Sequence, residues 1–167
     1  MIDALDQDVL AFVVFRLGEE EYAISIDRVE SIIRYEEPTP VPRAPDIVQG
    51  VINMRGRVIP VVDLSKRFRG SPFVSSSHSR IVVAEGAAGT LGLAVDAANE
   101  VANIPVTDVK PAPEGVLTPE TAGAITGVVD RNGKLVIILE LDEAIPKTEY
   151  VRTDRGDVTA EEGEPDV

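Results

Sequence analysis

A strand–turn–strand pattern occurs twice in this chain. Residues 50–65 align with residues 127–142 without a gap, at an offset of 77, and four of the sixteen positions are identical. In both copies, β-branched apolar runs flank a turn that contains Gly56 or Gly133. Asn132-Gly133 between two such runs is a strong hairpin signal. A chain that repeats this hairpin is constrained to a sheet-based fold with two similar halves.

An earlier block of the chain is also repeated. Residues 22–32 align with residues 91–101 at an offset of 69, and Asp27 matches Asp96. Apolar residues in both copies alternate with small or polar ones, which is the period of a strand. The proline-rich segment 38–45 forms neither a helix nor a central strand, because proline lacks an N–H group. Each half therefore supplies about five short strands.

We predict an all-β fold with two five-stranded SH3-like β-barrel subdomains from an internal duplication, with short helical turns. Five antiparallel strands hide their edges by curling into a small barrel. The predicted domain covers residues 10–146, as two intertwined subdomains of roughly 10–79 and 80–146. Residues 147–167 are acidic and poor in apolar side chains, which predicts a disordered tail. A groove between two barrels is a common type of binding site.

The charge balance excludes several classes of partner. The chain has 29 Asp and Glu against 16 Lys and Arg, a formal net charge of −13. Nucleic acids and anionic membranes both require a basic surface, so we expect no binding to nucleic acid and no direct binding to membranes. The scarcity of lysine leaves two explanations open, a salty cytoplasm or ordinary acidic solubility. With no cysteine, no long apolar run and an acidic start, we expect a cytoplasmic protein.

No constellation of residues indicates catalysis. The single histidine, His78, lies among serines in a segment that we interpret as an exposed loop, whereas a catalytic Ser–His pair needs a preorganised site. The segment 130–133 resembles the start of a calcium loop, but its glycine comes two places early and Leu141 stands where the ligand Glu is required. We therefore predict no catalytic residue, no metal, no cofactor and no enzymatic activity.

The hairpin turn of the first copy differs from its counterpart. Arg55 occupies the position of Asn132, where a type I′ turn requires a positive φ that suits Asn better than Arg. Either the first copy forms a type II turn with only Gly56 at positive φ, or Arg55 is held under strain. The side chain is either a solvated hairpin tip or a cation placed for protein recognition.

The segment 48–64, VQGVINMRGRVIPVVDL, resembles the signature of CheW-type chemotaxis coupling proteins. Residues 15–24 are similar to the first hairpin of that family, and residues 33–35 and 40–42 to its third strand and proline loop. Residues 111–113 and 125–127 resemble its second half. The resemblance covers roughly residues 10–146. It implies two five-stranded barrels and a non-catalytic adaptor between chemoreceptors and a kinase.

The resemblance also implies partners and a location. The expected partners are the regulatory domain of the histidine kinase CheA, which has the same fold, and the cytoplasmic tips of chemoreceptors. A cytoplasmic protein of this kind is recruited to membrane receptor arrays. Ser31 stands where the family often has Glu, with Glu30 beside it. The residues that match the family's signature turn and receptor-facing strand, and so form the expected protein-binding site, are Val29, Ile32, Ile33, Asn53, Arg55 and Gly56.

Other functions are weaker interpretations. A different protein-binding double-barrel scaffold would share every structural feature above. A small-barrel nucleic-acid binder would need basic surface and exposed aromatic side chains for base stacking, and only 4% of the residues are aromatic. A fusion with a phospho-receiver, or the regulatory part of the kinase itself, would need a longer chain. A hydrolase would need a constellation of carboxylates that the sequence does not contain.

Overall fold

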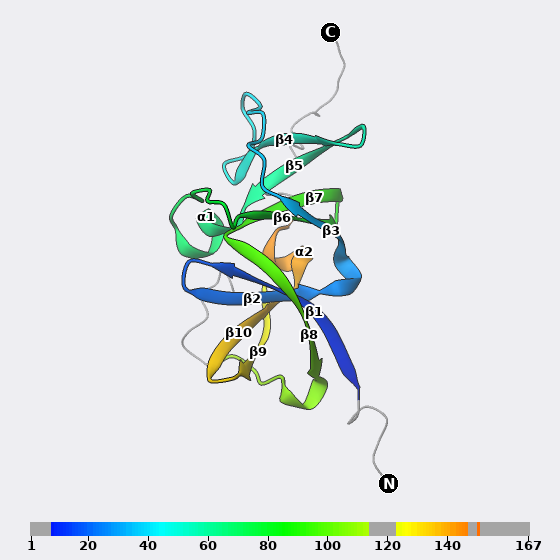
Figure 1. The fold of residues 1–167 in the computed structure, drawn as a ribbon, viewed down its shortest axis with the longest axis vertical. Helices are drawn as coiled ribbons and strands as arrows, with labels where there is room; N and C mark the ends of the chain where they lie inside the picture. The colour runs from blue at the N-terminus through cyan, green and yellow to red at the C-terminus, as the bar shows by residue number, and fades with distance from the viewer. Residues whose placement is uncertain (1–7, 114–122, 147–149, 151–167) are drawn as a thin grey trace.

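The computed structural model describes residues 8–113, 123–146 and Tyr150. Its strands form two five-stranded sheets, stacked along the long axis in Figure 1. Sheet 1 has the order β8-β1-β2-β10-β9 and sheet 2 the order β3-β6-β7-β5-β4. The strands are β1 (Val9–Leu17), β2 (Glu20–Ser25), β3 (Val29–Arg34), β4 (Val48–Met54), β5 (Arg57–Asp63), β6 (Arg80–Gly86), β7 (Gly89–Val95), β8 (Ala97–Pro105), β9 (Ile125–Arg131) and β10 (Lys134–Leu139). The helices are α1 (Leu64–Arg69) and α2 (Leu141–Ala144), with 3₁₀ turns η2 (Ile26–Arg28) and η3 (Val106–Asp108).

Each sheet draws strands from both halves of the sequence. The chain forms β1 and β2 in sheet 1, crosses at η2, forms β3 to β7 in sheet 2, and returns at Asp96 for β8 to β10. The prediction of subdomains at roughly 10–79 and 80–146 was therefore wrong in its boundaries. Short-range sequence patterns identify strands, but they do not indicate which strands pair, because pairing joins residues that are far apart in the sequence.

The two sheets have matching registers. Arg34 lies opposite Arg80 in sheet 2, and Asn103 lies opposite Ala11 in sheet 1. Asn103 comes 69 residues after Arg34, and Arg80 comes 69 residues after Ala11, so the two register pairs are equivalent. The turns Met54↔Arg57 and Arg131↔Lys134 are shifted by 77. Each sheet also contains one parallel pair, β5 with β7 and β10 with β2. The expectation of wholly antiparallel strands was wrong for these pairs, because the second hairpin of each sheet arrives from another part of the chain.

Each sheet curls, but no continuous ladder of hydrogen bonds joins its two outer strands into a closed barrel. In sheet 2, the chain beyond β3 forms an isolated bridge to β4: the Thr39 N–H donates to the Val51 carbonyl at 2.8 Å, and the Val51 N–H donates back at 2.9 Å. In sheet 1, Lys110 and Val128 exchange hydrogen bonds of 2.8 and 2.7 Å in the same way. The predicted closed barrels are thus curled sheets, each completed by one bridge.

Three apolar clusters hold the fold together. One lies inside sheet 1, around Phe12 and Val136, and another inside sheet 2, around Ile59 and Ile81. The largest lies between the sheets and includes Tyr150, which is only 6% exposed. Tyr150 belongs to the segment predicted as a disordered tail, so that prediction was wrong at this residue; the rest of 147–167 lies outside the described residues. No helix in the described part of the chain is long and apolar enough to cross a membrane.

Beside each closing bridge lies a glycine that cannot carry a side chain, because the neighbouring backbone leaves no room for a Cβ. A Cβ at Gly50 would meet the Thr39 carbonyl oxygen, and a Cβ at Gly127 would lie 2.6 Å from the Lys110 carbonyl oxygen. We expect Gly50→Ala and Gly127→Ala each to lower the free energy of unfolding by more than about 2 kcal/mol, measured by urea unfolding. Gly133→Ala, where no atom lies within 4 Å of the added Cβ, is the control and should cost less. Equal losses in all three variants would contradict the closing role.

Candidate functional site

The hairpin that joins β4 to β5 carries the predicted site residues of the signature segment. Arg55 has φ 55° and Gly56 φ 84°, nearly the same as φ 56° and 85° at Asn132 and Gly133. Both hairpins therefore have positive φ at both central residues, as in a type I′ turn. Of the two alternatives for this turn, the strained arginine is the correct one. Asn53 shapes the turn, because its Oδ1 accepts a hydrogen bond of 2.9 Å from the Gly56 N–H.

The guanidinium of Arg55 does not contribute to holding the fold. The residue is exposed at the tip of the hairpin. Within the described residues, its side chain has no hydrogen bond or ion pair. The turns themselves are supported by other side chains: Asn53 Oδ1 accepts from the Gly56 N–H in the first, and Asp130 Oδ1 accepts from the Gly133 N–H in the second. Arg55 thus combines a positive φ with a cation that has no partner among the described residues, and such strain tends to accumulate at functional sites.

A polar network fixes the base of this hairpin against β3. The Arg57 guanidinium donates through Nη2 to the Glu30 carboxylate and through Nη1 to the Thr90 hydroxyl, at 3.3 Å for the latter. The Thr90 hydroxyl in turn donates to Glu85 Oε2 at 2.8 Å. These contacts connect β5 with β3, β7 and β6. Sequence reasoning missed Arg57 and noted Glu30 only as the neighbour of Ser31; no local pattern indicates that the two side chains meet.

Apolar surface lies beside this network. Val58 is 65% exposed and lines a surface hollow of about 500 Å³ together with Arg57, Pro60 and Thr90. Tyr150 completes the hollow, and its hydroxyl accepts a hydrogen bond of 3.0 Å from the Ala88 N–H. An exposed apolar side chain beside an arginine fits the composition of a protein-docking surface.

The predicted residues on β3 are separated from the turn residues. β3 and β4 are the two outer strands of sheet 2, and Val29 and Ile32 are half-buried against the cluster between the sheets. Ile33 packs into the cluster inside sheet 2 instead. The six predicted residues therefore form two groups, and the Arg57–Glu30 contact is what connects the hairpin to the β3 group.

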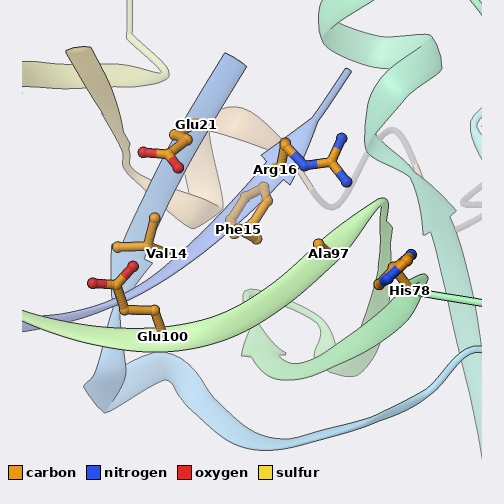
Figure 2. A pocket seen from close by; sticks show the side chains of 7 residues that line it. All are labelled: Val14, Phe15, Arg16, Glu21, His78, Ala97 and Glu100. Carbon is orange, nitrogen blue, oxygen red and sulfur yellow. The ribbon is translucent and has the colours of Figure 1, made fainter. Parts of the chain in front are cut away.

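A separate pocket of about 260 Å³ contains the only histidine (Figure 2). Glu21 and Glu100 lie toward one end of this view, with Arg16 and His78 toward the other and the Phe15 ring between them. The hydrogen bond recorded for His78 comes from its backbone N–H to Ser76 Oγ at 3.1 Å. No hydroxyl–imidazole hydrogen bond forms among the described residues, and these residues contain no group of three or more metal-ligating side chains.

The carboxylate of Glu100 in this pocket is held by an arginine from another strand. Arg131 Nη2 donates to Glu100 Oε2 at 2.7 Å, joining β9 to β8, the two outer strands of sheet 1. This hydrogen bond is the main cause that lowers the pKa of Glu100 from its ordinary value; burial opposes it, and the positive charge of Arg131 adds a lesser lowering. The pair therefore connects the two edges of the curled sheet through an ionised carboxylate.

The Glu100–Arg131 pair makes stability depend on pH in a defined direction. Because the pKa of Glu100 is lower in the folded chain, its stabilising contribution is present above the unfolded pKa and is lost as pH falls through the folded pKa. We expect Arg131→Gln to raise the Glu100 pKa toward its ordinary value, measured by a carboxyl ¹³C NMR titration. Arg131→Lys, which keeps the charge, should raise it less. An unchanged pKa in Arg131→Gln would contradict the pairing.

Exchanging the two turn residues tests the strain at Arg55. We expect Arg55→Asn to raise the free energy of unfolding by about 1 kcal/mol, because Asn tolerates a positive φ better than Arg. Asn132→Arg should lower it by a similar amount, and the double exchange should be nearly neutral. Urea unfolding of the three variants measures this. A loss of stability in Arg55→Asn would show that the guanidinium supports the fold.

Comparisons with known proteins agree with this architecture. A family model described as the CheW-like domain matches residues 11–149. The chain is 34% identical to "Chemotaxis protein CheW" of Rhizobium meliloti over 82% of this chain and 88% of the relative. It is also 34% identical to the protein of that name in Bacillus subtilis, over 81% and 86%. The crystal structure of the scaffolding protein TtCheW from Thermoanaerobacter tengcongensis superposes with a TM-score of 0.73 and 32% identity, covering 87% of this chain and 93% of that one.

Proposed function

The chain belongs to the CheW-like family and is a chemotaxis coupling adaptor, and on that premise we propose that it links the cytoplasmic tips of chemoreceptors to the histidine kinase CheA. It does so without catalysis, by presenting a docking surface around the hairpin of β4 and β5. It is cytoplasmic and reaches the membrane only through recruitment to receptor arrays. Its net charge of −13 supports contact with proteins over direct contact with anionic lipid.

The observation that carries the proposal is the strained, unpaired arginine at the hairpin tip. Arg55 keeps a positive φ of 55° although Asn, at the equivalent turn of the same chain, relieves that strain. Its guanidinium is exposed and has no partner within the described residues. An arginine can bind a carboxylate through two parallel hydrogen bonds, which makes it a strong recognition residue. The cost in stability is therefore offset by a contact with a partner protein.

The surroundings of Arg55 support a docking surface of useful size. The Arg57–Glu30 contact holds the hairpin against β3, so that the partner meets a preorganised surface. Val58, at 65% exposure, supplies the apolar part. On β3 we assign partner contact to Val29, Ile32 and Ile33, whose side chains are each only half-buried against an apolar cluster. Asn53 and Gly56 act by setting the shape of the turn.

We further propose that the two sheets are SH3-like units that arose by internal duplication and then exchanged strands. The matching offsets of 69 and 77 in the registers support this origin, as do the equivalent bridges at Val51 and Val128. Under this proposal the chain is one intertwined domain across residues 10–146. The hairpin of β4 and β5 is the specialised copy, and the hairpin of β9 and β10 is the copy that retained turn-favouring residues.

Removing the Arg55 guanidinium tests the adaptor function. We expect Arg55→Ala to weaken the capture of receptor tips or of CheA by about tenfold or more. The unfolding midpoint should stay near that of the wild type, because Ala carries the same positive-φ strain as Arg. Asn132→Ala is the matched control in the second hairpin and should leave capture unchanged. Unchanged capture in Arg55→Ala, or capture of neither partner by the wild type, would refute the proposal.

A further inference from the structure

Two arginines lie directly opposite each other at the end of sheet 2. Arg34 on β3 and Arg80 on β6 are register partners, and like charges in this position repel each other. Neither forms an ion pair within the described residues, although the chain has 29 acidic side chains. Arg34 is exposed and has no hydrogen-bond partner in the described part of the chain. Arg80 is held by hydrogen bonds to backbone carbonyls of the serine loop, whereas nothing in the described residues compensates the charge of Arg34.

The internal repeat shows that the fold does not require these arginines. The equivalent register pair in sheet 1, shifted by 69 residues, is Asn103 opposite Ala11. The neighbouring position is Tyr35 in sheet 2 and Ile104 in sheet 1, and both side chains pack into the cluster inside their own sheet. The backbone and the interior are thus alike in the two sheets, and only sheet 2 has two cations at this edge.

The arginines border a preformed polar pocket of about 280 Å³, lined by Arg34, Tyr35, Ser76, Ser77, Ser79 and Arg80. The serine loop is ordered by its own hydrogen bonds: the Ser76 N–H donates to Ser79 Oγ at 2.8 Å, and the Ser79 N–H donates to the Ser76 carbonyl at 3.1 Å. Arg80 Nη1 donates to the Ser79 and Ser77 carbonyls at 2.8 and 3.3 Å, which fixes its guanidinium in the wall. The Tyr35 ring packs on Phe73, with centroids 4.8 Å apart.

We propose that this Arg34–Arg80 pocket binds a phosphate group. A phosphate monoester carries a charge of roughly −1.5 to −2 at pH 7, close to the sum of two guanidinium charges. Guanidinium groups bind phosphate oxygens through paired hydrogen bonds, and serine hydroxyls supply further donors. Because the protein as a whole repels anions, such a ligand must be held by local contacts. The proposal is independent of the adaptor function, which depends on the hairpin of β4 and β5.

The ligand has two possible sources, the free phosphate ion and a phosphomonoester, and a titration separates them. The full-length chain is titrated with inorganic phosphate and, separately, with glycerol 2-phosphate, at constant ionic strength and followed by ¹⁵N NMR. We expect saturable shifts at the backbone amides of residues 76–80. Tighter binding of inorganic phosphate identifies the free ion as the ligand, and tighter binding of glycerol 2-phosphate identifies a monoester. Acetate at the same concentrations should produce no saturable shift.

Charge-matched variants assign the binding to the pocket. Arg34→Gln should weaken phosphate binding by about tenfold or more, and Arg34→Lys should weaken it less, because lysine keeps the charge but loses the paired donors. Arg34 has no protein partner in the described residues, so its variants should fold even if Arg80→Gln does not. Lys134→Gln, an equal change of charge at an exposed site on sheet 1, should leave binding unchanged. Absence of saturable shifts, equal affinity for acetate, or an equal loss in Lys134→Gln would overturn the proposal.

Discussion

The parallel pairing between distant segments is the constraint on which the rest of the structure depends. β5 joins sheet 2 by pairing with β7, at Val61↔Gly92, and β10 joins sheet 1 by pairing with β2, at Ile138↔Ala23. Sheet 1 is built from strands on both sides of sheet 2 in the sequence, because β1 and β2 come before β3 and β8 to β10 come after β7. The two sheets consequently share one core between them, and neither half of the sequence can fold as an independent barrel. The closing bridges Thr39↔Val51 and Lys110↔Val128 lie next to Gly50 and Gly127, where an added Cβ would meet the Thr39 or the Lys110 carbonyl oxygen.

This arrangement places the two hairpins in equivalent positions, so exposure alone does not distinguish them. Val58 is 65% exposed and its counterpart Leu135 is 62% exposed. What differs is the residue at the tip of the turn. Both hairpins have an arginine ion pair at the base, Arg57 with Glu30 on β3 and Arg131 with Glu100 on β8. The first hairpin has a strained arginine at its tip, whereas the second has Asn132. The proposed docking surface therefore depends on side chains that the shared architecture does not require.

The same comparison between copies identifies the second candidate site. Arg34 and Arg80 correspond to Asn103 and Ala11 of sheet 1, so the shared strand pairing does not itself require two arginines there. Two sheets with matching registers thus supply a reference for each other: positions that agree between them maintain the strands, and positions that depart from the pattern are the ones that we propose for binding. This reasoning applies to Arg55 on one edge of sheet 2 and to the arginine pair on the other.

The sequence by itself determined the strands, the two Gly-containing turns, the repeat and the family, because these depend on local periodicity, turn chemistry and a specific motif. It also singled out Arg55, since a positive φ can be inferred from the Asn at the equivalent position. Only the tertiary structure decided which strands pair across the crossings, that Tyr150 belongs to the core, and that Arg57 meets Glu30 and Arg34 meets Arg80. These contacts join residues up to more than a hundred positions apart, as for Tyr22 and Ile137, and a local pattern carries no information about a partner at that separation.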